Sequence, residues 1–125
     1  MKAIAFFVSM LFPCFSYSSE GYSIVLSNSS MLIMMDMKCS PCDIECNKIT
    51  YRMFDTYQSI QISGKAESLN AGVNRNFVGY RLLGHKESYR LSASAKDNVW
   101  DLYTESNGKV ISKSQVNTVY DDGTC

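Results

Sequence analysis

Residues 77–113 read FVGYRLLGHKESYRLSASAKDNVWDLYTESNGKVISK and contain the strongest hairpin signal of the chain. Its apolar and aromatic residues alternate with polar ones in four short runs, at residues 77–83, 88–94, 99–105 and 109–113. A period of two is typical of strands that bury one face. Turn-forming residues separate the runs, and Asn107-Gly108 has the composition of a two-residue type I′ hairpin turn. The stretch therefore predicts consecutive antiparallel strands.

Strand patterns continue on both sides of this stretch, by alternation in most runs and, at residues 31–37, by an apolar run that could be a strand buried on both faces. Further strands are expected at residues 22–26, 31–37, 49–53 and 60–62, and a weaker one at 115–120. The polar residues 65–76 predict a long surface loop. Ser40 and Pro41 suit the start of a short helical turn that would run through Cys46. We therefore predict an all-β protein, a small antiparallel barrel or sandwich of about eight short strands, with at most one short helical turn and disulfide staples.

Residues 1–18 have the composition of a secretory signal peptide. Lys2 precedes the apolar run at residues 3–12, and Ser16 and Ser18 are small residues at the positions that signal peptidase reads, so cleavage is expected near Ser18. The apolar run is too short to span a bilayer, and no transmembrane segment is expected. Cys14 offers the alternative of a lipoprotein, but Pro13 is not the small residue that acylation requires.

These features predict a periplasmic or secreted protein. Residues 1–18 form the signal peptide and residues 19–125 a single β domain. The mature part keeps an even number of cysteines, namely Cys39, Cys42, Cys46 and Cys125. Such a set in a short exported chain predicts two disulfides. The pairing stays open, although the position of Cys125 favours a bond to the 39–46 cluster.

The cysteine cluster also permits two other hypotheses. Cys39 and Cys42 have the spacing of a redox-active dithiol, which would make the chain an exported thiol-disulfide protein. Three thiolates, with Cys125 or His85 as a fourth ligand, could hold zinc. The sequence lacks the alternating strand and helix pattern of thioredoxin-like proteins and lacks a second metal-binding motif, so structural disulfides are favoured and no metal site is predicted.

The sequence contains no recognisable catalytic machinery. Its one histidine, His85, lies beside Gly84 in an expected surface turn, and Asp121-Asp122 lies in a polar segment near the C-terminus. We therefore predict no enzyme activity, no catalytic residue and no cofactor. Lys and Arg together number 12, as do Asp and Glu, and this balance gives no basic surface for nucleic acid.

One family resemblance adds to these expectations. The order of Ser92-Ala93-Ser94, Trp100 and a C-terminal Cys125 is similar to that in the C-type lysozyme inhibitors. These belong to the small periplasmic inhibitor and immunity proteins of Gram-negative bacteria. The resemblance implies an eight-stranded barrel that inserts a polar loop into the cleft of an enzyme.

The resemblance also implies which residues touch a partner. Ser92, Ser94 and Lys96 would be the loop residues that reach a partner's carboxylates, because hydroxyl and ammonium groups donate hydrogen bonds to them. Our leading hypothesis is an exported protein that blocks a protein partner, such as a cell-wall hydrolase or toxin, through the regions 65–76 and 92–98. The other hypotheses are the thiol-disulfide protein described above and a structural component of the envelope.

Overall fold

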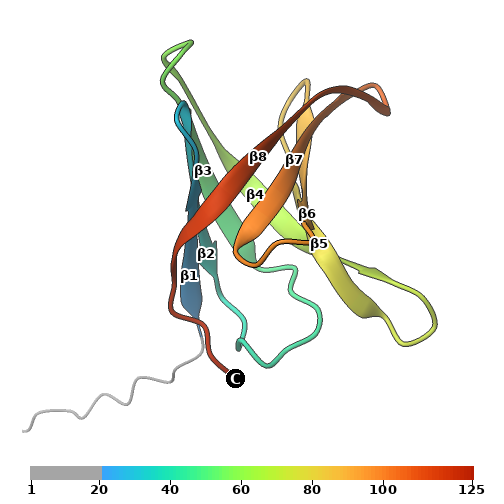
Figure 1. The fold of residues 1–125 in the computed structure, drawn as a ribbon. Helices are drawn as coiled ribbons and strands as arrows, with labels where there is room; N and C mark the ends of the chain where they lie inside the picture. The colour runs from blue at the N-terminus through green and yellow to red at the C-terminus, as the bar shows by residue number, and fades with distance from the viewer. Residues whose placement is uncertain (1–20) are drawn as a thin grey trace, which may run out of the picture.

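The structure, a computed structural model, describes residues 21–125 (Figure 1). This part of the chain forms eight strands and no helix. The strands are β1 (Tyr22–Ser27), β2 (Met31–Met37), β3 (Ile49–Asp55), β4 (Ile60–Ala71), β5 (Asn76–Leu82), β6 (Ser88–Ala93), β7 (Val99–Ser106) and β8 (Lys109–Asp121). The expected signal peptide, its cleavage near Ser18 and the lipidation of Cys14 fall outside the described residues.

The strands close into an antiparallel barrel. Each strand pairs with its neighbours along the chain, and β1 also pairs with β8, so that the spatial order follows the order in the sequence. The predicted class, an all-β fold with a small antiparallel barrel or sandwich and disulfide staples, is confirmed, and the architecture is the barrel.

Alternate residues of the strands fill the barrel. In β2, Ile33, Met35 and Met37 are buried, whereas Asp36 faces solvent. The other buried strand residues with apolar or aromatic side chains are Ile24, Leu26, Ile49, Tyr51, Met53, Ala66, Tyr80, Leu82, Tyr89, Leu91, Leu102 and Val116. Their removal from water stabilises the fold, at roughly 25 cal/mol for each Å² of apolar surface.

Two glycines permit conformations that the barrel requires. Asn107 and Gly108 have φ angles of 54° and 78°, the positive values of a type I′ turn, and join β7 to β8 as predicted. At Gly79, a Cβ atom would lie 2.0 Å from the carbonyl oxygen of Leu91. Only glycine therefore lets β5 approach β6 this closely.

The prediction of a long surface loop over residues 65–76 is wrong. Residues 65–71 continue β4, and only residues 72–75 turn the chain into β5. Ser68 lies two residues after the buried Ala66 and so faces the same side of the strand. Its hydroxyl accepts a hydrogen bond from the backbone of Cys46, so a polar residue stands where an alternating strand pattern would place an apolar one.

The helical turn expected from Ser40 to Cys46 does not form either. Its capping contacts are present, because the Asp43 carboxylate accepts the Ser40 N–H and the Ser40 hydroxyl accepts the Cys42 N–H. The helix does not continue because the Ile44 carbonyl and the Cys46 N–H bond to side chains of β4.

The two ends of the barrel differ. One end, at the bottom of Figure 1, carries the segment 38–48, the turns 72–75 and 94–98, and the C-terminus. Both disulfides lie there, and we call it the stapled end. The other end carries the turns 28–30, 56–59, 83–87 and 107–108, and we call it the open end.

Strand β8 is longer than the sequence suggests. The runs 109–113 and 115–120 form one strand because Ser114 continues the pairing with Leu102 of β7. Strand β1 pairs with β8 only at residues 117–121. Among the described strands, the first part of β8 thus pairs with β7 alone, and the β7–β8 and β3–β4 hairpins diverge at the open end (Figure 1).

Candidate functional site

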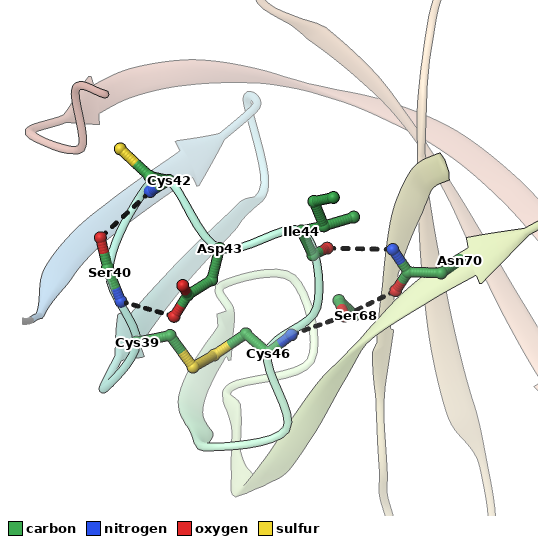
Figure 2. The surroundings of a disulfide bond; sticks show 8 residues. All are labelled: Cys39, Ser40, Cys42, Asp43, Ile44, Cys46, Ser68 and Asn70. Carbon is green, nitrogen blue, oxygen red and sulfur yellow. Dashed lines mark hydrogen bonds between the residues drawn. A yellow bond between two sulfur atoms is a disulfide. The ribbon is translucent and has the colours of Figure 1, made fainter. Parts of the chain in front are cut away.

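Two disulfides hold the stapled end together. Cys39 is bonded to Cys46 within the segment 38–48 (Figure 2), and Cys42 is bonded to Cys125, which ties the C-terminus to that segment. Cys39 and Cys42 therefore have different partners and do not form the disulfide that a C-x-x-C redox site uses. The four cysteines within residues 21–125 are all in disulfides, which leaves none of these four as a thiolate ligand for zinc.

Hydrogen bonds dock the segment 38–48 onto β4. Ser68 exchanges two bonds of 2.8 Å with the backbone of Cys46, one through its hydroxyl oxygen and one through its N–H. The Ser68 hydroxyl also donates to the side-chain oxygen of Asn70 at 2.9 Å. The Asn70 amide then donates to the Ile44 carbonyl at 2.9 Å (Figure 2). The segment is thus bonded to β4 at Ile44 and Cys46, and the two disulfides hold it at Cys39, Cys42 and Cys46.

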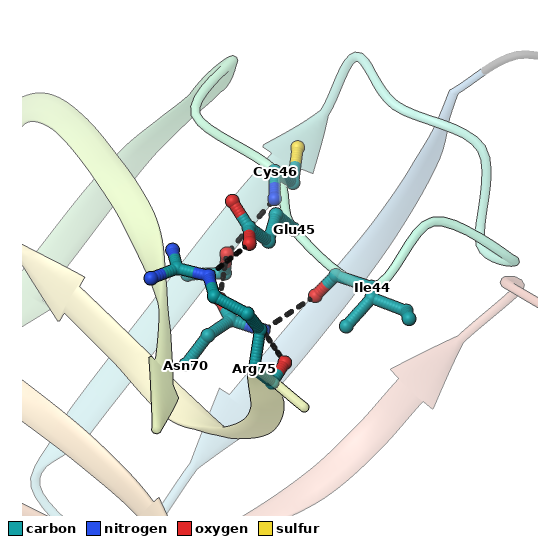
Figure 3. A network of polar contacts seen from close by, with 6 residues as sticks. Ile44, Glu45, Cys46, Asn70 and Arg75 are labelled. Carbon is teal, nitrogen blue, oxygen red and sulfur yellow. Dashed lines mark hydrogen bonds and ion pairs between the residues drawn. The ribbon is translucent and has the colours of Figure 1, made fainter. Parts of the chain in front are cut away.

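A polar network joins the segment 38–48 to the turn 72–75. The Asn70 amide donates to the carbonyl of Arg75 as well as to that of Ile44, and the Arg75 guanidinium forms an ion pair with Glu45 (Figure 3). The hydrogen bond from Arg75 lowers the pKa of the Glu45 carboxyl. Because both side chains are exposed, we expect this pair to orient the two loops and to add little stability.

Aromatic side chains close the barrel behind these loops. The ring centroids of Phe77 and Tyr80 lie 4.9 Å apart, and those of Tyr80 and Trp100 lie 5.8 Å apart. The Trp100 indole N–H donates to the Thr118 hydroxyl at 3.1 Å, which fixes the ring. Such contacts add rigidity beyond simple burial.

A hollow of about 340 Å³ opens beside these rings. Its lining includes Tyr22, Phe77, Tyr80, Trp100, Asp43 and Asp121. Burial raises the pKa of the Tyr80 phenol, and nearby Tyr22 and Asp121 raise it further, so this phenol stays neutral at ordinary pH. The hollow therefore offers aromatic faces and two carboxylates, a combination that suits a cationic side chain of a partner.

The structure places two of the predicted contact residues together and separates the third. Ser94 and Lys96 share the turn 94–98, where the Lys96 N–H donates to the Ser94 hydroxyl at 3.2 Å and the Lys96 side chain is exposed. Ser92 lies on β6 and alternates with the buried Leu91, so it faces the outer wall of the barrel. Ser92 is thus not part of the turn.

Exposed apolar side chains at the stapled end were not predicted from the sequence. Ile44 is 59 % exposed, Val73 99 % and Phe77 40 %. Ile44 and Val73 lie in the two loops that the Glu45–Arg75 pair connects. In the sequence, the sign of this exposure was that single apolar residues occur in otherwise polar segments. That sign is weak because isolated exposed apolar residues are common.

The described residues were also searched for a metal-binding group and for a membrane-spanning helix. His85 is exposed in the turn 83–87, and no group of three His, Cys, Asp or Glu residues within positions 21–125 could hold a metal ion. In the same part of the chain, no helix has the length and apolar character needed to cross a membrane. No protein-family model, curated protein or solved structure was found to match this chain.

Proposed function

We propose that this protein is an exported binding protein that uses its stapled end to block a protein partner, such as a cell-wall hydrolase or a toxin. Its two disulfides indicate an oxidising compartment outside the cytoplasm, and we place the protein in the periplasm or outside the cell. The role is that of an inhibitor or immunity protein, with no catalysis.

The observation that carries this proposal is a set of apolar side chains exposed on a rigid frame. Ile44 and Val73 lie mostly in solvent, although disulfides and hydrogen bonds fix the backbone that carries Ile44. Contiguous exposed apolar patches mark interaction surfaces, and we infer that Ile44 and Val73, on loops that the Glu45–Arg75 pair connects, form such a patch. A pre-ordered loop also loses little conformational entropy when a partner binds, which favours affinity.

Polar groups beside this surface would orient the partner. Lys96 projects into solvent from the turn 94–98 at the same end, and it can donate to a carboxylate in a partner's cleft. The hollow with Asp43 and Asp121 can accept a cationic side chain in return. This surface therefore suits a partner that carries both an acidic group and a basic group around an apolar centre.

A comparison of charged variants tests the proposal. The oxidised protein serves as bait in extracts of the periplasm and of neighbouring cells, and the activity of any captured hydrolase or toxin is titrated with it. We expect loss of that activity at equimolar bait. The double variant I44D/V73D should weaken binding at least tenfold, because it places charges in an apolar contact.

The matched control is V110D at the open end, where Val110 is 51 % exposed. This variant should bind with unchanged affinity. A partner that remains fully active when saturated, or that V110D weakens as much as I44D/V73D, would overturn the proposal. A partner retained only through a mixed disulfide would instead support thiol chemistry.

A further inference from the structure

A second cavity lies at the open end, on the opposite side of the barrel from the stapled end. Its volume is about 350 Å³, within the range of small-molecule sites. Its apolar lining includes Met31, Met53, Ile60, Ile62, Leu102 and Ile111. Met53 and Leu102 are buried and form the floor, whereas Ile60 and Ile111 are 41 % and 55 % exposed at the mouth.

The cavity exists because β8 supplies small residues where the barrel needs large ones. Ser112 and Ser114 pair with Thr104 and Leu102 of β7 and line the cavity. The buried Val116 follows on the same face of β8, but serines take the next two inward positions toward the open end. Residues 109–115 of β8 do not pair with β1. This part of β8 is therefore separated from the β3–β4 hairpin across the open end.

The mouth carries negative charge. Asp55 and Glu87 line the cavity, and among the described residues its lining includes no Lys, Arg or His. The Asp55 carboxylate is held in place because one of its oxygens accepts the N–H groups of Tyr57 and Gln58. Its other oxygen has no such bond among the described residues. The Asp55 carboxylate is therefore positioned at the mouth by the chain itself.

Tyr89 lies between the apolar floor and this charged mouth. Its ring is buried, and its hydroxyl is 3.4 Å from a carboxylate oxygen of Glu87. Burial raises the pKa of Tyr89 to about 12, and Glu87 and Asp55 both contribute. The Glu87 and Asp55 carboxylates thus both raise the pKa of the same phenol, which agrees with the two groups facing the same space.

We propose that the open end binds a small amphiphile that has an apolar chain and a cationic, ammonium-type head. The chain would occupy the space above Met53 and Leu102, where it leaves water. The head would lie between Asp55 and Glu87, which would exclude an amphiphile with an anionic head. This site is separate from the partner-binding surface and does not depend on it.

Two ligands of eight carbon atoms each, with head groups of opposite charge, test the proposal. Octylammonium and octanoate are titrated into the purified, oxidised protein at pH 7, and binding is followed by calorimetry. Octylammonium should bind at least tenfold more tightly than octanoate. In the variant D55N/E87Q, this preference should fall to less than threefold while the protein stays folded, because both changes lie at the exposed mouth.

A cavity-filling variant locates the ligand. S114W should abolish octylammonium binding, whereas S63W, on an exposed residue of β4 that does not line the cavity, should leave it unchanged. The proposal is overturned if octylammonium does not bind, if octanoate binds equally well, or if S114W and S63W behave alike. Should S114W fail to fold, the charge variant still decides, because it leaves the packing of the cavity intact.

Discussion

Replacing both cysteines of the Cys42–Cys125 disulfide with serine should destabilise the protein more than the same change at Cys39 and Cys46. The first bond joins residues 83 apart, and loop-closure entropy for that length corresponds to about 4.5 kcal/mol. The second joins residues 7 apart and corresponds to about 2.4 kcal/mol. The free energies of unfolding of the two variants should therefore differ by about 2 kcal/mol.

Urea unfolding of each double variant, followed by fluorescence and extrapolated linearly to water, measures this difference. Partner binding should show the opposite order, because the Cys39–Cys46 bond shapes the segment that carries Ile44. A C39S/C46S variant at least as destabilised as C42S/C125S would refute the reasoning from loop length. Equal losses of partner affinity would contradict the expectation that the Cys39–Cys46 bond matters more for binding.

Three further predictions follow from single contacts. G79A should lower the free energy of unfolding by about 2 kcal/mol in thermal melts, because its Cβ would meet backbone, whereas G72A, which has open space but a φ of 82°, should cost less because only the strain of that angle opposes it. The pKa of Tyr89 is raised in the folded state to about 12, so folding favours the neutral phenol. The contribution of Tyr89 to the free energy of unfolding is therefore complete below pH 10.0 and is lost as the pH rises toward about 12, because the unfolded chain loses the phenol proton first. Urea midpoints across this range should fall less for Y89F than for the wild type. E45Q should leave the melting temperature almost unchanged because the Glu45–Arg75 pair is exposed, but it should weaken partner binding by releasing the turn 72–75.

Local signals allowed much of the barrel to be predicted. Asn107-Gly108 identifies its hairpin because the required positive φ angles are a property of those two residues alone. The apolar run of residues 31–37 likewise identified β2 as a strand, but the structure buries only one of its faces, with Ile33 and Met35 inside and Asp36 outside. Closure of β1 onto β8 depends on strands far apart in the chain. The sequence therefore could not distinguish a barrel from a sandwich.

The incorrect predictions concern residues whose partners come from elsewhere. Ser68 and Asn70 look like loop residues because their hydrogen bonds are made with the segment 38–48 and not with a core. The same bonds explain why the capped turn at Ser40 does not become a helix. Among the candidate site residues, Ser94 and Lys96 were placed in a turn correctly, but the exposure of Ile44 could not be derived without the docked segment.

The meander order of the strands also sets the sequence of folding events. Seven of the eight pairings join neighbouring strands and form between residues that are close along the chain, which is rapid. The pairing of Ile24 with Asp121 and the Cys42–Cys125 bond instead bring together the two ends of the domain. Cys39 can reach Cys46 long before Cys42 can meet Cys125. A nascent domain therefore passes through a stage with one bond made and two unpaired thiols, during which its last strand is still open to wrong partners.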